Sequence, residues 1–159
     1  MIAKYMGNEY TYISNRRGKE IITTQKGKIK NGFTYVNGMY YKAVDEKELT
    51  DIYVVEFWVK YKSAYNGVSD WWKLGSEQNV IEDNKLQLIF AEGILPNWTI
   101  VDKNVCSTMI PLDKILEAKM VFSYIKRDGV ALEERITEER IISIKELKQL
   151  HDGYCRMSL

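Results

Sequence analysis

The residues with the clearest capacity for chemistry are the single histidine and the two cysteines. His151 and Cys155 are four residues apart, a spacing that places two side chains on one face of a helix. A catalytic Cys–His pair also needs a third group that orients the histidine and a pocket that admits substrate. The terminal segment offers neither, so His151 is expected to be an ordinary surface histidine. We also expect Cys106 and Cys155 to be reduced, buried thiols, and we predict no catalytic residue.

No ligand spacing typical of a metal or a cofactor occurs along the chain. The two cysteines are far apart and belong to no CxxC motif. The glycines fall in turn-like segments, and neither GxGxxG nor GxxxxGK[ST] is present. The sequence therefore predicts no metal site and no cofactor, and it gives no reason to expect an enzyme.

Paired carboxylates are frequent, but their surroundings are typical of a protein surface. The stretch "EERITEER", residues 133–140, alternates acids with arginines, as expected for a solvated strand face with cross-strand ion pairs. Glu56 interrupts an apolar strand face, and we expect it to face solvent or to have a charged partner.

The stretch "SDWWKLGSEQN", residues 69–79, points to binding instead of catalysis. Adjacent side chains of a strand face opposite ways, so one of the two tryptophans should face away from the core. Tryptophan and tyrosine are enriched at protein interfaces, and the acids around them suit a basic protein partner or a sugar. A purely structural alternative is that one tryptophan closes the core and the other lies flat on a neighbour. The predicted partner-binding residues are Tyr65, Asp70, Trp71, Trp72 and Glu77.

Alternating apolar residues and turn pairs predict the strands that position this segment. Asn37-Gly38 and Asp128-Gly129 lie between such runs, and Asn-Gly and Asp-Gly are strong signals for tight hairpins. The run "IYVVEFWVKY", residues 52–61, is predicted to be a central strand, covered on both faces.

Three helices are expected between and after these strands. Asp45 and Glu48 have capping-box spacing and predict a short helix over 45–51, and Pro111 suits the start of another over 111–117. Ser143 and Glu146 form a second capping box, before an apolar stripe that predicts a C-terminal helix. The expected fold class is α+β: a mainly antiparallel, twisted sheet with two short helices and a C-terminal helix.

One domain over residues 1–159 is expected, because no linker or low-complexity segment divides the chain. The blocks "YYKAVDEKELTDIYVVEFWVKY" and "CSTMIPLDKILEAKMVFSYIKR" both read as strand, short helix and strong strand. This recurrence is compatible with two similar halves, although strand–helix–strand connections are common in unrelated folds.

The composition of the chain limits the classes of partner that can be expected. There are 23 basic and 22 acidic residues, a net charge of +1, so a general nucleic-acid binder is not expected, although local basic patches remain open. No apolar run approaches the length of a membrane span, and the N-terminus lacks a signal peptide. We expect a cytoplasmic protein that has no membrane partner.

The opening "MIAKYMGNEYTYIS", the strand–helix–strand block "YYKAVDEKELTDIYVVEFWVKY" and the second block "IPLDKILEAKMVFSYIKRDG" together resemble small cytosolic immunity proteins encoded beside polymorphic toxins in bacteria. The resemblance implies that the chain binds a cognate toxin domain and blocks its active site or substrate access, with no catalytic residue or cofactor. Many immunity proteins against nucleases are strongly acidic, and this chain is not. The alternative is a small-ligand, carbohydrate or nucleic-acid binding domain that uses an aromatic surface.

Overall fold

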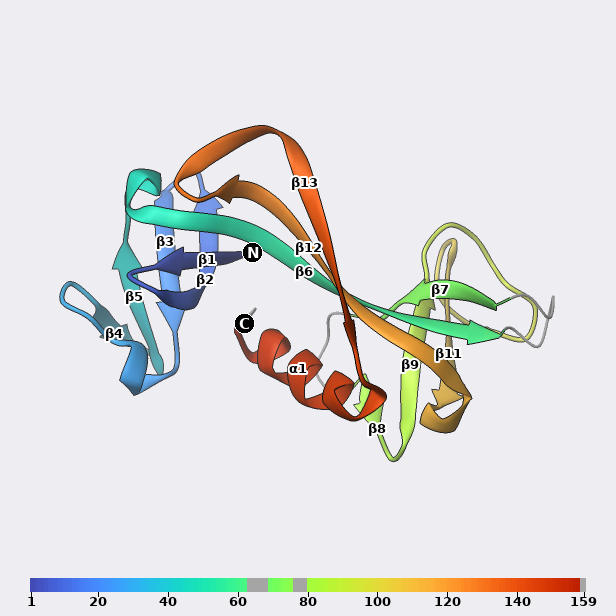
Figure 1. Ribbon diagram of the computed structural model, residues 1–159. Coiled ribbons are helices and arrows are strands. Elements are labelled where there is room, and N and C mark those ends of the chain that lie inside the picture. Colours follow the sequence, from blue (N-terminus) through green and yellow to red (C-terminus); the bar gives the residue numbers. More distant parts are fainter. Residues whose placement is uncertain (63–68, 76–79, 158–159) are drawn as a thin grey trace. The chain divides into compact units, whose positions relative to one another are not determined.

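The computed structural model describes residues 1–62, 69–75 and 80–157 (Figure 1). It is mostly β, with 62% of its residues in strands and 15% in helices. The larger sheet contains β1 (Ile2–Tyr5), β2 (Asn8–Asn15), β3 (Gly18–Thr23), β4 (Thr34–Val36), β5 (Met39–Ala43), β6 (Leu49–Lys62), β7 (Ser69–Lys73), β12 (Ile115–Arg127) and β13 (Val130–Ile142). The smaller sheet contains β8 (Ile81–Glu82), β9 (Lys85–Phe90), β10 (Thr99–Asp102) and β11 (Val105–Pro111). Helical segments are α1 (Ile144–Met157) and the 3-10 turns η1 (Lys26–Lys28), η2 (Glu46–Glu48) and η3 (Leu112–Lys114).

The expected α+β class with two short helices before the C-terminal helix is wrong. Residues 45–51 and 111–117 form only the single 3-10 turns η2 and η3, which leaves α1 as the one α-helix among the described residues. The Asp45–Glu48 capping box is present, so the turn begins as predicted. Strand β6 then starts at Leu49, because the β-branched and aromatic residues that follow favour a pleated strand.

The chain divides into two compact units that share its longest strands. The first unit contains residues 1–55, 122–138 and 156–159, and the second contains residues 56–121 and 139–155. Strands β6, β12 and β13 each begin in one unit and end in the other. Each unit is described by itself below.

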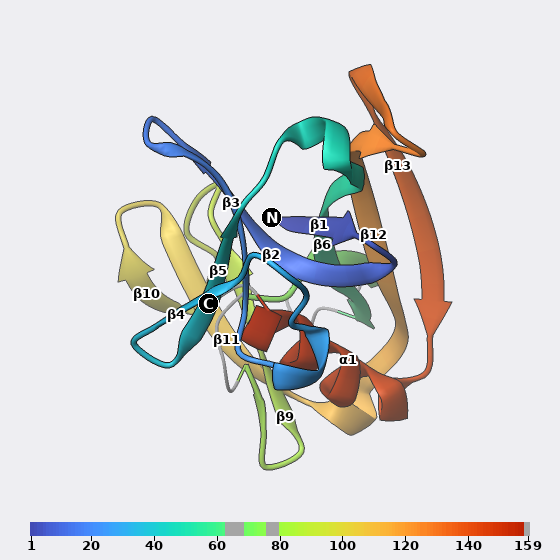
Figure 2. The same cartoon turned by 90° about the vertical axis from the view of Figure 1, so that its left-hand side faces the viewer.

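In the first unit, the strand order around the N-terminal hairpins is β6-β1-β2-β3-β5-β4, and Figures 1 and 2 show β3 beside β5. Three of the eight buried residues in the core of this unit are tyrosines. Tyr10 stacks on Phe33, and its hydroxyl donates to the Lys28 backbone oxygen at 2.6 Å. A tyrosine ring can be buried in this way because its hydroxyl keeps a hydrogen-bond partner inside the protein. The rest of this core consists of Ala3, Tyr5, Tyr12, Ile21, Val44, Leu49 and Ile52, with Ile125 against it.

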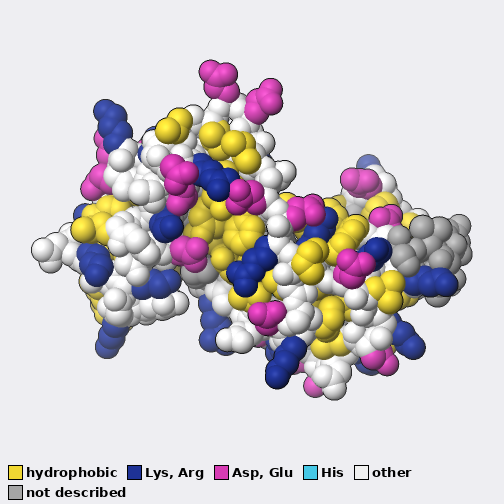
Figure 3. Space-filling model, viewed as in Figure 1, with side chains coloured by type: hydrophobic (Ala, Val, Ile, Leu, Met, Phe, Trp, Pro, Cys, Tyr) yellow, Lys and Arg dark blue, Asp and Glu magenta, His cyan; other side chains and the backbone are white. Residues whose placement is uncertain are grey.

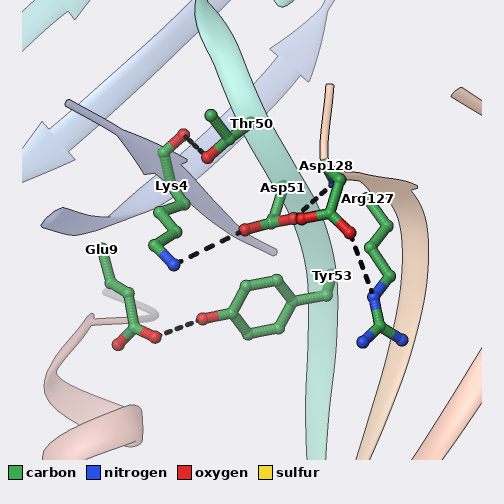
Figure 4. Close-up of polar contacts among 7 residues, drawn as sticks. All are labelled: Lys4, Glu9, Thr50, Asp51, Tyr53, Arg127 and Asp128. Atoms are coloured by element: carbon green, nitrogen blue, oxygen red, sulfur yellow. Dashed lines mark hydrogen bonds and ion pairs between the residues drawn. The ribbon is translucent and has the colours of Figure 1, made fainter. Parts of the chain in front are cut away.

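A polar cluster in the first unit ties the β12–β13 turn to β6 (Figure 4). The Asp51 carboxylate accepts the backbone N–H of Asp128 at 2.9 Å and lies 3.8 Å from the Lys4 ammonium. The Tyr53 hydroxyl donates to the Glu9 carboxylate beside them. The bond to Asp128 anchors the hairpin turn on β6, and the other two contacts join β1 and β2 to β6.

In the second unit, α1 contributes a buried stripe. The Ser143–Glu146 capping box forms as predicted: the Ser143 hydroxyl accepts the Glu146 N–H at 3.2 Å, and the Glu146 carboxylate accepts the Ser143 N–H at 3.0 Å. Leu147 is fully buried. The other buried apolar side chains of this unit include Phe57, Val59, Leu74, Leu86, Leu88, Ile110, Ala118 and Met120. None of the described helices has both the length and the apolar character needed to cross a membrane.

The two units repeat one strand-pairing register. The pair β3·β5 in the first unit and the pair β9·β11 in the second are both antiparallel, and each is followed by a 3-10 turn and a long strand. The corresponding residue pairs run from Glu20–Ala43 to Thr23–Tyr40 in the first unit and from Lys85–Pro111 to Leu88–Thr108 in the second. The recurrence seen in the sequence therefore has a counterpart in the pairing of strands.

Candidate functional site

Strand β7 presents its two tryptophans to opposite faces of the second unit. Trp72 pairs with Val59, which is fully buried, whereas Trp71 pairs with Lys60. Because alternate residues of a strand share a face, Trp72 lies on the core side and Trp71 on the other. The expectation that one of the pair faces away from the core is confirmed.

Trp72 is held by other aromatic rings. Its ring centroid lies 5.1 Å from that of Trp98 and 6.1 Å from that of Phe90, the latter in an edge-to-face arrangement. The indole nitrogen of Trp72 is buried and has no hydrogen-bond acceptor among the described residues. A buried donor without an acceptor lowers the free energy of unfolding, so the burial of this indole nitrogen reduces stability.

The Trp71 ring contacts a charged side chain, whereas the Trp72 ring contacts other aromatic rings. The Lys119 ammonium lies 4.4 Å from the centroid of the Trp71 ring, in a cation–π arrangement, and is 2.7 Å from the Glu139 carboxylate. The Asp70 carboxylate accepts the backbone N–H of Trp71 at 2.7 Å. Side chains from elsewhere in the second unit therefore contact β7 on both of its faces.

A cavity of about 320 Å³ opens between β7 and the end of β9. Leu74, directly after β7, forms an antiparallel bridge with Leu88 of β9. Continued pairing would match residues 70–73 with residues 89–92, and these two stretches line the cavity together with Trp58. We call this cavity the β7 pocket. It lies where two strands that pair at one point diverge.

The walls of the β7 pocket are aromatic, and two free acids belong to it. Asp70 and Glu92 line it, are exposed and form no ion pair with any described residue. The cation of the lining, Lys73, is paired with Glu56, which also accepts from the Trp58 indole at 3.3 Å. The prediction that Glu56 is partnered is confirmed, and the uncompensated charge of the pocket is negative.

The predicted binding residues that the structure describes lie on one wall of this pocket, and none of them lies on the other wall. Asp70, Trp71 and Trp72 all line it, whereas Tyr65 and Glu77 lie outside the described residues. The missed wall is the stretch 89–92, which reaches the pocket only because Leu74 pairs with Leu88. No local signal in the sequence specifies that long-range pairing.

His151 is buried, so the expectation of a surface histidine is wrong. It is 1% exposed, its Nε2 lies 2.8 Å from the Gly75 backbone oxygen, and its ring meets Phe57 edge-on. A carbonyl oxygen only accepts, so Nε2 carries the proton, and the Cys155 sulfur lies 3.6 Å from Nδ1 and 3.7 Å from Nε2. Burial, and then the nearby Asp152, raise the pKa of Cys155, which disfavours the thiolate that a nucleophile requires.

Two of the paired acids in the stretch 133–140 form ion pairs at the surface. On β13, Glu138 pairs with Arg127 in the first unit and Glu139 with Lys119 in the second, which confirms the cross-strand ion pairs expected there. In the described part of the chain, no three His, Cys, Asp or Glu side chains are grouped so that they could hold a metal ion.

Comparison with known proteins gives a family and no function. No curated protein and no solved structure matches the chain. A family model described as "Uncharacterised conserved protein UCP033725" matches residues 1–93, a range that includes both sides of the β7 pocket. Since the match covers more than half of the chain, the protein belongs to the family of uncharacterised conserved protein UCP033725.

Proposed function

We propose that the protein is a non-catalytic binding module that holds a partner protein at the β7 pocket. The observation that carries the proposal is the lining of this pocket, with aromatic walls and two acids that form no ion pair with a described residue. Aromatic side chains in a concave site bury a large area with little loss of conformational entropy, which is the chemistry of an interface anchor.

A basic side chain of the partner is the occupant that fits this pocket best. The face of a tryptophan ring attracts a guanidinium or an ammonium group, and Arg is the cation found most often in such contacts. Asp70 and Glu92 would then neutralise the charge of that group. Lys73 competes little, because its ammonium is already paired with Glu56.

The resemblance to immunity proteins gives the proposal a specific form. In that form the partner is a cognate toxin domain, and the protein binds it in the cytoplasm and covers its active site. An inhibitor of this kind acts by occupancy alone and requires no reacting group. The raised pKa of the Cys155 thiol agrees with such a role.

Binding of an arginine peptide tests the pocket directly. The four tryptophans report binding, so a blocked peptide with one central arginine is titrated while tryptophan emission is followed. The citrulline peptide, which has the same shape and no charge, should bind at least about tenfold more weakly. Asp70→Asn and Glu92→Gln should each lower the affinity for the arginine peptide. Glu82 is an exposed acid outside the pocket, so Glu82→Gln should leave that affinity unchanged. Equal binding of the two peptides would contradict the proposal.

The toxin form of the proposal is tested separately. A toxin domain encoded beside this gene is captured on the immobilised protein, and Trp71→Ala and Trp72→Ala are compared with the parent. An anchor tryptophan contributes about 2–4 kcal/mol, so each variant should bind about 30- to 1000-fold more weakly. Folded variants that bind like the parent would place the interface elsewhere.

A small neutral ligand is the second candidate, and the size of the cavity favours it. About 320 Å³ lies at the lower end of the range for small-molecule sites. Sugars stack on tryptophan and donate to carboxylates, so the pocket would suit a monosaccharide. The same fluorescence titration with a panel of neutral monosaccharides distinguishes this case: a response to a sugar and none to the arginine peptide would support it.

A further inference from the structure

The near-neutral net charge of the chain hides a strong separation of charge. Residues 16–42 contain seven of the 23 basic residues and one of the 22 acidic residues. The rest of the chain therefore has 16 basic residues against 21 acidic ones. In Figure 3, several Lys and Arg side chains gather over β3, β4 and β5, the elements that this segment forms. A local basic surface exists although the whole protein is balanced.

Exposed aromatic rings lie within this basic segment. Tyr35 of β4 pairs across the hairpin with Tyr40 of β5, and their ring centroids are 4.9 Å apart. Tyr35 is 61% exposed and belongs to β4, the last strand of its sheet order. The two rings are tilted by 48° and form a small aromatic platform, in which Tyr35 is exposed and Tyr40 is partly buried.

Three lysines of the same segment are linked to the strand of Tyr40 by chain proximity or by contacts of neighbouring residues. Lys42 is two residues after Tyr40 on the same strand, so the two side chains share a face. Its ammonium donates to the Asn31 backbone oxygen at 3.3 Å, which places residue 30 and its exposed lysine beside this face. Lys26, exposed in η1, follows β3, and Thr23 of that strand pairs with Tyr40. Lys26, Lys30 and Lys42 form no ion pair with a described carboxylate.

We propose that this surface, made of Lys26, Lys30, Tyr35, Tyr40 and Lys42, binds single-stranded nucleic acid. Stacking of bases on exposed aromatic rings, with lysines that follow the phosphates, is the general chemistry of single-strand binding. Charge alone would suit an acidic protein or an anionic membrane equally well. The paired tyrosine rings favour a ligand with planar bases, and a duplex hides the faces of its bases from such a platform. This surface belongs to the first unit, and the proposal does not depend on the β7 pocket.

Fluorescence anisotropy of a labelled oligonucleotide of about 12 thymidines tests the proposal on the whole chain. Tyr35→Leu should weaken binding about tenfold, whereas Tyr35→Phe, which keeps the ring, should bind like the parent. Lys26→Gln with Lys30→Gln should weaken binding and reduce its dependence on salt. Lys145→Gln with Lys148→Gln removes the same charge from α1 and serves as the matched control. With three phosphate contacts, raising salt from about 50 to about 200 mM should weaken parent binding about 20-fold.

Three results would overturn the proposal. The first is no change in anisotropy with any labelled single strand, and the second is equal binding of Tyr35→Leu and the parent. The third is equal affinity for polyglutamate or for phosphatidylserine vesicles with the same pattern among the variants. That result would assign the surface to an acidic protein or to a membrane. Circular dichroism of each variant confirms that a loss of binding is not a loss of folding.

Discussion

At the scale of residues, adjacent tryptophans were informative because strand geometry constrains them. Alternation of faces required that Trp71 and Trp72 differ in environment, and they do. What alternation could not supply was the identity of their neighbours. Trp98 and Lys119 are distant in sequence, and only tertiary packing brings them to these rings.

Substitution of the two tryptophans should affect stability unequally. Trp72→Ala removes a ring packed on Phe90 and Trp98, so it should cost about 3 kcal/mol in the free energy of unfolding. Trp71→Ala should cost less, because it loses mainly a cation–π contact worth about 0.5–1 kcal/mol. Trp72→Phe should be milder than Trp72→Ala, since it keeps an aromatic ring in the cluster while it removes the buried donor that has no described acceptor. Urea unfolding measures all three, and a larger loss for Trp71→Ala would contradict this ordering.

Acid should destabilise the protein partly through Glu46. Its carboxylate lies 2.9 Å from the Lys19 ammonium and accepts the Tyr12 hydroxyl at 2.8 Å, and these bonds lower its pKa below the usual 4.5. A lowered pKa in the folded state means that the unfolded chain binds this proton more tightly. The stabilisation is therefore present above about pH 4.5 and is lost as pH falls through the folded pKa.

Glu46→Gln tests this contribution. The free energy of unfolding, measured in urea between about pH 7 and about pH 3, should fall less steeply in the variant than in the parent. Glu133→Gln, an exposed acid on β13 of the same unit, is the control and should keep the parental slope. The same steepness in all three proteins would show that Glu46 does not contribute.

At the scale of elements, the capping signals correctly predicted where helical segments begin. They did not predict how long those segments are. Asp45 and Glu48 form their capping box, but a helix must continue for several turns before it is stable, and the residues after Glu48 favour a strand. The C-terminal helix did form, because its capping box is followed by an apolar stripe long enough to bury. The buried face of this helix includes His151, whose Nε2 lies against the distant backbone oxygen of Gly75.

The packing of α1 should depend most on Leu147. This side chain is fully buried, so Leu147→Ala should cost about 2–5 kcal/mol through lost contacts and the cavity left behind. Lys148→Ala, at the next, exposed position, should change the free energy of unfolding by less than about 0.5 kcal/mol. An unfolding midpoint of Leu147→Ala equal to that of the parent would mean that the helix adds nothing to stability.

At the scale of the whole molecule, sequence predicted antiparallel hairpins but not how they combine into two sheets. Asn37-Gly38 and Asp128-Gly129 form the expected turns, each with both residues at positive φ. The β7 pocket required the pairing of Leu74 with Leu88, and pairings of this kind depend on burial on both sides, which no local pattern encodes. The charge separation, by contrast, was present in the sequence and was obscured by a net value of +1.

Unfolding of the two units should be coupled, because three strands pass from one unit into the other. Strand β6 continues from residue 55 to residue 56 without interruption, and β12 and β13 cross the division in the same way. Loss of the ladder in one unit therefore frees the end of a strand in the other. Small proteins with such continuity usually unfold in a single cooperative transition.

The positions of the tryptophans allow a direct test of this coupling. All four lie in the second unit, so their emission reports on that unit alone. Ile21 is fully buried in the first unit, and Ile21→Ala should cost about 2–5 kcal/mol. If the units unfold together, this change lowers the urea midpoint of tryptophan emission by on the order of 1 M. It should lower the midpoint from far-UV circular dichroism by the same amount. A tryptophan midpoint that stays at the parental value, while circular dichroism shows an earlier transition, would mean that the units unfold independently.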